Sequence, residues 1–254
     1  MMQTNLYGHR GARGEKPENT LEGFFHAQAL GLTGVETDMA LTADLVPVLH
    51  HDPALLDGHL IRHLKFADLP AEIPSLAQAL RAIPEIEWLL EIKTFPNHPE
   101  QSYPPSLMVQ QMLAVLGETS GISLRVLAFD WAVLRAVAAQ APWVPRVCLT
   151  APKTAEARDI WWGPGFAGMS VPDAVAAASA SGWAAFQGAL SKPEVERARA
   201  LGLEVFAWTV NEAEDFCRLA PLVDGVITDH PTRLLPWLAE PGRAPAPDHF
   251  KNGG

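Results

Sequence analysis

Short apolar runs of four to six residues recur along the chain and alternate with longer segments of helical pattern. Because these runs lack the alternation of apolar and polar residues found in half-exposed strands, they indicate strands buried on both faces, as in a parallel sheet. Eight such strands with helices between them, in 254 residues, predict an α/β fold of the (β/α)8 or TIM barrel class. The eight runs lie within the segments NLYGH, GVETDMA, EWLLEIK, SLRVLAFD, VPRVCLT, WAAFQG, LEVFAWTVN and DGVITDHP.

An open, doubly wound sheet is the rival architecture, but no glycine fingerprint of the dinucleotide-binding type follows the first run.

The alanine-rich stretch 153–182 is expected to be largely helical, interrupted by WWGPGF. Nothing marks a domain boundary, so residues 1–240 are predicted as a single domain and 241–254 as a flexible C-terminal tail. The other helices are expected over roughly 20–30, 73–83 (with Ser75 as its cap), 105–116, 131–140, 193–202, 212–220 and 231–239.

The composition of the chain limits the binding partners and the cellular compartment that we expect for the protein. The formal net charge of −10 argues against nucleic acid, whose phosphates need basic surfaces, but a bound cation would still permit a small anionic substrate. Cys148 and Cys217 are expected to be buried fillers in a reducing cytosol rather than a disulfide. No charged-then-apolar leader and no apolar run of membrane-spanning length is present, which predicts a cytoplasmic protein. The sequence does not indicate an oligomeric state.

Polar residues occur at the carboxyl ends of the predicted strands, the edge at which barrel active sites are built. Glu36 and Asp38 end the second run, and Glu91 ends the third. Residues two apart in a strand share a face, so paired carboxylates on the inner face would repel each other unless a cation lay between them. One acidic pair alone would more often be a surface ion pair. The third acid, with His9 and His51 near other strand ends, favours a metal site, and all-oxygen ligands suit Mg²⁺ or Ca²⁺ better than zinc.

His9 and His51 are interpreted as a proton donor and a proton acceptor, because a histidine pKa of about 6.5 suits both roles near neutral pH. His50 stays ambiguous, since neighbours in a strand point to opposite faces and only one of His50 and His51 should enter the barrel mouth. Five other histidines are expected to be structural or exposed: His26, His59, His63, His98 and His249.

Basic and aromatic side chains accompany these groups. Arg10 has a planar fork suited to a phosphate, and Lys93 either holds a phosphate oxygen or simply pairs with Glu91. A tryptophan on an apolar strand is most often a core residue. Because Trp208 lies at a strand end, it could instead form the wall of a ligand pocket. For the unexplained pair Trp161-Trp162, burial is favoured over a lipid-facing lip.

Three further residues have competing interpretations. Asn19 makes an N-terminal capping pattern with Glu22, three residues later, and otherwise would support the metal site. Glu18 would support either the metal or Arg10. Asp52 either fixes the tautomer of the preceding histidine or forms a turn before a proline.

Taken in order along nearly the whole chain, these motifs resemble the glycerophosphodiester phosphodiesterase family. They are HRG…PENT at 9–20, VETD at 35–38, HHDP at 50–53, IPSL at 73–76, LLEIK at 89–93, AWTVN at 207–211 and DGVITDHP at 224–231. The resemblance implies a (β/α)8 barrel, a divalent metal on the three acids, His9 and His51 as an acid–base pair, and a phosphate near Arg10 and Lys93.

The reaction that the resemblance implies is hydrolysis of a glycerophosphodiester to sn-glycerol 3-phosphate and an alcohol, in lipid and glycerol metabolism. One Mg²⁺ or Ca²⁺ ion, with Mn²⁺ as a further candidate, would assist it. In one mechanism proposed for the family, a substrate hydroxyl attacks phosphorus first. A lysophospholipase D-like or cyclising enzyme acting on lipids, and a non-catalytic barrel that binds phosphorylated ligands, are the alternatives.

Two departures from the family pattern bear on specificity. Only about twenty residues separate His51 from Ile73, where many relatives carry a longer insertion, so the selection of the alcohol is open. Ala128-Phe129 replaces the usual Ser-Phe at the end of the fourth strand, which predicts the loss of one hydrogen bond to the substrate.

Overall fold

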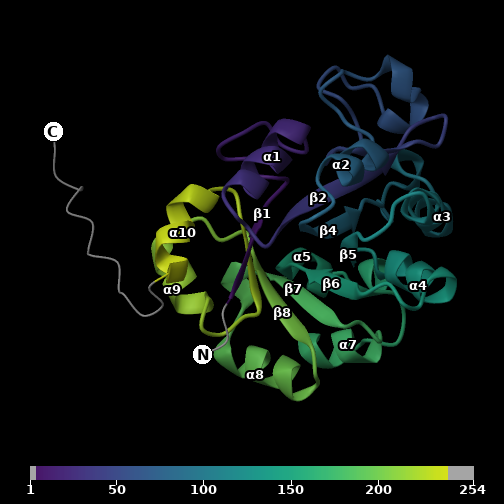
Figure 1. Ribbon diagram of the computed structural model, residues 1–254. Coiled ribbons are helices and arrows are strands. Elements are labelled where there is room, and N and C mark those ends of the chain that lie inside the picture. The colour runs from purple at the N-terminus through teal and green to yellow at the C-terminus, as the bar shows by residue number, and fades with distance from the viewer. Residues whose placement is uncertain (1–3, 240–254) are drawn as a thin grey trace, which may run out of the picture.

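The first strand of the structure pairs with both the second and the last, and this closes the sheet into a barrel. The computed structural model describes residues 4–239, and Figure 1 shows the helices surrounding the strands. The predicted TIM barrel is therefore confirmed. The eight parallel strands are β1 (Asn5–Gly8), β2 (Gly34–Leu41), β4 (Glu87–Ile92), β5 (Ser123–Ala128), β6 (Arg146–Thr150), β7 (Gly182–Phe186), β8 (Glu204–Trp208) and β9 (Gly225–Thr228). The proposed tail, 241–254, lies outside the described residues.

A ninth strand, β3 (Pro47–Leu49), pairs antiparallel with the far end of β2. It leads into an excursion with two short 3₁₀ helices, Ile61–His63 and Phe66–Asp68, before the chain returns to the barrel. The guanidinium of Arg62 donates to the carbonyl oxygens of Pro99 and Glu100, which ties this excursion to the segment after β4. The excursion therefore forms a fixed part of the barrel mouth.

Helices cover the outside of the barrel. The predicted cap of α2 is confirmed, because the Ser75 hydroxyl accepts the Gln78 amide while the Gln78 side chain accepts the Ser75 amide. The cap of α1 is Thr20, so the capping role predicted for Asn19 is wrong. The helices are α1 (Leu21–Ala29), α2 (Leu76–Ala82), α3 (Pro105–Gly117), α4 (Trp131–Gln140), α5 (Pro152–Glu156), α6 (Arg158–Trp161), α7 (Val171–Ala177), α8 (Lys192–Ala200), α9 (Ala213–Leu219) and α10 (Pro231–Ala239).

The stretch 153–182 is less helical than expected. It contains the short helices α5, α6 and α7, and a loop separates the last two. Gly163, Gly165 and Gly168 in this loop all have positive φ values, between 74° and 99°, a backbone conformation that ends a helix. The last residues of the stretch form the turn before β7, and Gly182 is the first residue of that strand.

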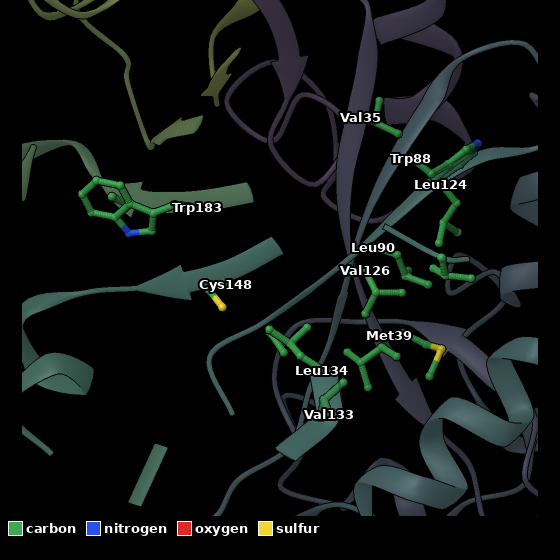
Figure 2. Close-up of a cluster of buried hydrophobic side chains, with 14 of the residues drawn as sticks. Val35, Met39, Trp88, Leu90, Leu124, Val126, Val133, Leu134, Cys148 and Trp183 are labelled. Carbon is green, nitrogen blue, oxygen red and sulfur yellow. The ribbon is translucent and has the colours of Figure 1, made fainter. Parts of the chain in front are cut away.

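The hydrophobic core has an outer and an inner part because successive strand residues face opposite ways. Figure 2 shows the outer part, where Val35, Met39 and Trp88 lie together with Cys148. Cys148 is buried, as predicted, and burial raises the pKa of its thiol; Cys217 is half-buried on α9. The inner part fills the barrel and consists of Tyr7, Leu89, Leu127, Val147, Leu149, Ala184, Phe206 and Ile227.

Below the inner apolar part, at the amino ends of the strands, a charged cluster closes the barrel. Arg125 Nε lies 2.6 Å from Glu87 Oε1, and the same guanidinium pairs with Glu204. The hydroxyl of Tyr7 donates to Glu87 Oε2 at 2.6 Å. We call these four residues the basal cluster. Among residues 4–239, no helix has the combined length and apolarity that a membrane crossing requires.

Candidate active site

The opposite, carboxyl-terminal end of the barrel holds a pocket of about 420 Å³. All eight residues predicted to act in catalysis, metal binding or substrate binding line it, although they come from five separate parts of the chain. They are His9, Arg10, Glu36, Asp38, His51, Glu91, Lys93 and Trp208.

Three buried carboxylates converge in this pocket. Glu36 and Asp38 share the inner face of β2, and Asp38 is in register with Glu91 on β4. One carboxylate oxygen from each residue lies within 4.8 Å of the other two. The donor set is entirely oxygen, and this spacing allows one divalent cation to contact all three side chains.

The three carboxylates differ in how closely a positively charged side chain approaches them. Lys93 Nζ lies 3.0 Å from Asp38 Oδ1 and 2.8 Å from Glu91 Oε1. Although burial opposes it, the Lys93 ammonium holds the pKa of Asp38 well below its usual value. Burial raises the pKa of Glu91 to about 7 against the pull of Lys93. Burial, with repulsion from Asp38 and Glu91, raises the pKa of Glu36 well above its ordinary value. The cluster therefore lacks positive charge, which a divalent cation would supply.

Asn19 orients Asp38. Its Nδ2 donates to Asp38 Oδ2 at 3.0 Å, and its Oδ1 accepts the Thr37 hydroxyl at 2.7 Å. The residue is buried, with a φ of 55° in the left-handed region that asparagine tolerates better than most residues. Within the PENT motif, the side chain of Asn19 therefore lies in the site, and the next residue, Thr20, caps the helix.

Arg10 lies beside the same carboxylate. Its NH1 is 2.9 Å from Glu18 Oε1, its Nε is 3.4 Å from Asp38 Oδ2, and its backbone N–H donates to Glu36 Oε2 at 3.1 Å. Glu18 therefore contacts Arg10 and does not belong to the three-carboxylate group. Within the described residues, the buried Nε of Arg10 makes no hydrogen bond, so it remains a donor at the wall of the pocket.

Of the neighbouring histidines, His51 lines the pocket. Its Nδ1 lies 2.7 Å from Asp52 Oδ1, while His50 Nδ1 is 2.9 Å from the Asp52 carbonyl oxygen. Burial and the Lys93 ammonium lower the pKa of His51. Both residues follow β3 rather than continue it, so a turn, and not the alternation of a strand, separates their side chains.

His9 follows β1 and has an aspartate of its own. Its Nδ1 lies 2.6 Å from Asp229 Oδ1, and its Nε2 lies 3.7 Å from Glu36 Oε2. Sequence reasoning missed Asp229, although this residue follows the last barrel strand just as His9 follows the first. The rule that polar residues at strand ends converge could have found it.

Aromatic residues form the other side of the mouth. The rings of Trp208 and Phe129 are 5.5 Å apart between centroids, and those of Trp208 and Phe186 are 5.8 Å apart. Trp161 is half-buried against Phe129 at 6.4 Å. The predicted burial of Trp162 is confirmed, because it is fully buried and stacks on Trp131 at 4.4 Å.

Ala128 packs in the outer core, and the next residue, Phe129, lines the pocket. A serine hydroxyl in place of the Ala128 methyl would therefore face the helices. The expected loss of a substrate hydrogen bond at this position does not follow from the structure.

Residues 9–233 match the sequence model of the glycerophosphoryl diester phosphodiesterase family. The chain belongs to this family. Among relatives of this phosphodiesterase, YhdW of Bacillus subtilis is 26% identical over 252 residues, which cover 91% of this chain and 96% of YhdW. A Mycobacterium tuberculosis protein, named probable glycerophosphodiester phosphodiesterase 1, is 28% identical over 274 residues, covering 94% of this chain and 93% of its own.

Solved structures show the same barrel as this phosphodiesterase. A Silicibacter pomeroyi protein of the family is 30% identical, with a TM-score of 0.82 and 93% of each chain covered. An Oleispira antarctica phosphodiesterase, solved in complex with its product sn-glycerol-3-phosphate, has a TM-score of 0.78 at 22% identity and covers 94% of this chain and 98% of its own. The second likeness shows the shared fold.

Proposed function

We propose that this phosphodiesterase hydrolyses glycerophosphodiesters to sn-glycerol 3-phosphate and an alcohol, with one divalent cation, Mg²⁺ or Ca²⁺, and with Mn²⁺ as a further candidate. The observation that carries the proposal is the convergence of three buried carboxylates and two histidines in one pocket. The product bound to the Oleispira antarctica phosphodiesterase supports the choice of product for a barrel of this shape.

Glu36, Asp38 and Glu91 would hold the cation, because their oxygens form a compact, all-carboxylate set. When bound, the ion would polarise the phosphoryl oxygens and neutralise charge that develops on them. Lys93 and Arg10 both line the pocket and contact Asp38, and they would contact the phosphate oxygens that the ion leaves free. Asn19 would keep Asp38 in a fixed orientation as a ligand.

His9 and His51 would move the protons. In both residues Nδ1 contacts an aspartate, so Nε2 is the nitrogen that exchanges a proton with the substrate. One histidine would take the proton from the attacking substrate hydroxyl, and the other would protonate the departing alkoxide, which gives a cyclic phosphate and the free alcohol. The two roles would then be exchanged as a water molecule opens the cyclic phosphate to sn-glycerol 3-phosphate. Asp52 would fix the tautomer of His51, and Trp208 would contact the carbon atoms of the substrate.

The test is release of sn-glycerol 3-phosphate from glycerophosphocholine, glycerophosphoethanolamine and glycerophosphoglycerol after treatment with EDTA. We expect activity to disappear and to return when magnesium, calcium or manganese is added. His51→Ala should abolish turnover, whereas His63→Ala, a matched change at an exposed histidine, should not. Full activity in the chelated protein would overturn metal dependence, and full activity in His51→Ala would overturn the mechanism.

A lipid substrate is the second candidate, and the aromatic side of the mouth favours it. Phe129, Trp161, Phe186 and Trp208 would accept an acyl chain as readily as a small alcohol. Turnover of lysophosphatidylcholine well above that of glycerophosphocholine would replace the first proposal with this one. Binding of sn-glycerol 3-phosphate without turnover of either compound would identify a non-catalytic barrel.

We also propose a cytoplasmic protein that acts on small molecules and does not bind nucleic acid. The net charge of −10 supports the exclusion of nucleic acid, because a net negative charge repels nucleic-acid phosphates. Fractionation of cells that express the tagged chain tests the location. Retention on immobilised DNA or RNA at low salt would contradict the exclusion of nucleic acid.

A further inference from the structure

Asp229 joins the ends of three elements at the barrel mouth. Its Oδ1 lies 2.6 Å from His9 Nδ1 and 3.6 Å from Arg13 Nε. Its Oδ2 accepts the side-chain amide of Asn211 at 2.8 Å. Both carboxylate oxygens therefore have partners, and the side chain, 18% exposed, cannot rotate without breaking one of these contacts.

Asn211, which follows β8, fixes Asp229 from behind. While its Nδ2 donates to the carboxylate, its Oδ1 accepts the Asp229 backbone N–H at 2.9 Å and the Thr228 hydroxyl at 3.2 Å. These contacts determine which end of the amide is oxygen. The orientation of Asn211 is thus set by backbone and side-chain donors on β9 and the residue after it.

The two histidines are supported very differently. Asp52, the partner of His51 Nδ1, is 70% exposed and comes from the adjacent position in the chain. Asp229, the partner of His9, comes from the opposite end of the chain and has a second support of its own. A half-buried carboxylate held at both oxygens restricts an imidazole more than an exposed one does.

We propose that Asp229, held by Asn211, is the positioning residue for His9: it accepts a hydrogen bond from the Nδ1–H group and so keeps Nε2 directed at the pocket as the nitrogen that exchanges protons. This inference rests on the proposed function, because it assigns His9 its working orientation. Neither Asp229 nor Asn211 lines the pocket, so both act through His9.

The substitution Asp229→Asn tests the inference sharply. Asn211 already presents its N–H₂ group to the position of Oδ2, so the new amide would turn its own oxygen there and its N–H₂ toward His9. That arrangement would force Nδ1 of His9 to accept and would place the ring proton on Nε2. We expect kcat to fall by about 100-fold or more, as when the support of a catalytic imidazole imposes the wrong tautomer.

The Michaelis constant and the affinity for Mn²⁺, titrated calorimetrically, should change by less than about threefold, since Asp229 touches neither the carboxylate group nor the pocket. Asn211→Ala should lower kcat by about tenfold, because Asp229 keeps its charge but loses its fixed orientation. Asp52→Asn should lower kcat less than Asp229→Asn. Asp224→Asn changes a half-buried aspartate before the other end of β9 and is the matched control.

Nitrogen-15 spectra of histidine provide a readout that does not depend on turnover. His9, identified by the signal lost in His9→Gln, should be protonated at Nδ1 in the unmodified protein and at Nε2 in Asp229→Asn. An unchanged tautomer, or a kcat within about threefold of the original, would overturn the inference. Equal losses in kcat and Mn²⁺ affinity would also overturn it, because they would indicate a general structural role. Absence of turnover in the unmodified protein would refute the proposed function, whereas the spectra would still decide the role of Asp229.

Discussion

Two charged clusters lie inside the same barrel, one at each end. In the basal cluster, Arg125 lies between Glu87 and Glu204, and Tyr7 donates to Glu87. At the mouth, Glu36, Asp38 and Glu91 face one another. The inner apolar residues separate the two clusters. Both ends therefore bring acids together in the interior, yet their charges are satisfied in different ways.

The difference lies in the distribution of the cations. One guanidinium contacts both basal carboxylates, so each has a charged partner. At the mouth, Lys93 contacts Asp38 and Glu91, but the contacts of Glu36 among the described residues are the Arg10 backbone N–H and His9 Nε2, 3.7 Å away. A cluster that satisfies its own charge stabilises the fold, whereas a cluster short of positive charge is suited to bind an ion.

The largest expected effect is a loss of activity without a loss of stability when a carboxylate at the mouth is removed. Glu36→Gln removes the carboxylate with the fewest charged partners. We expect kcat/KM to fall by about 1000-fold, because metal assistance supplies several kcal/mol of transition-state stabilisation. The chelated protein should be no less stable than the original, since a repelling charge has been removed. Thermal unfolding and steady-state kinetics measure the two quantities, and a clear loss of thermal stability would contradict the comparison.

The basal cluster should respond in the opposite way. Arg125→Met leaves two carboxylates facing each other without a cation, and the structure is expected to lose about 2 kcal/mol, a value discounted for the partial exposure of the cluster. Activity at 25 °C should stay within about twofold of the original, because the inner apolar residues separate Arg125 from the pocket. Urea denaturation tests the first statement.

A combined variant sharpens this test. Adding Glu87→Gln and Glu204→Gln to Arg125→Met removes the unpaired charges, and part of the lost stability should return. If the triple variant is no more stable than the single one, the basal cluster contributes by packing rather than by charge.

The fold could be predicted from the sequence because its signals are local. The apolar runs identify strands buried on both faces, and Ser75 marks a helix start through its own hydrogen bonds. The stretch 153–182 was harder to predict, because alanine favours a helix while the glycines after α6 adopt left-handed conformations that end it.

The site could be predicted in part, since residues at strand ends converge once a barrel is assumed. Asn19 shows where that reasoning leaves two alternatives open. An asparagine before a helix fits a cap equally well, and only the tertiary fold brings Asp38 within hydrogen-bonding distance of it. Asp229, whose partner His9 lies at the other end of the chain, differs from Asn19, because it follows the last barrel strand and the convergence of strand ends predicts its place.

Asn19→Ala is expected to have a moderate effect at the mouth. It removes the amide donor to Asp38 Oδ2 and leaves Lys93 and Arg10 as the neighbours that orient this carboxylate. Metal affinity should fall by about tenfold, the lower end of the range for residues that orient metal ligands. Calorimetric titration with Mn²⁺ measures it, with Thr20→Ser as the matched control that keeps the helix cap. An unchanged affinity would show that Asp38 needs no second support.

The smallest expected effect is a dependence of stability on pH that the basal cluster should not share. Burial raises the pKa of Glu91 to about 7 from an ordinary 4.5, and Glu36 shifts in the same direction. Between these values the folded protein holds a proton that the unfolded chain has lost. The chelated protein should therefore lose stability as the pH rises from about 5 to about 7.5, by roughly 1–2 kcal/mol or a few degrees in Tm.

His51 works against this trend, because its lowered pKa makes the unfolded chain the better proton binder near pH 6. The informative quantity is thus the difference between the original protein and Glu91→Gln, which keeps His51 and removes one raised carboxyl group. That difference should grow as the pH rises and should reverse when Mg²⁺ is added, since the cation replaces the proton as the partner of the carboxylates and binds more tightly to the original protein than to a variant that lacks one ligand. A difference independent of pH would mean that Lys93 already neutralises Glu91, and the two ends of the barrel would then be alike.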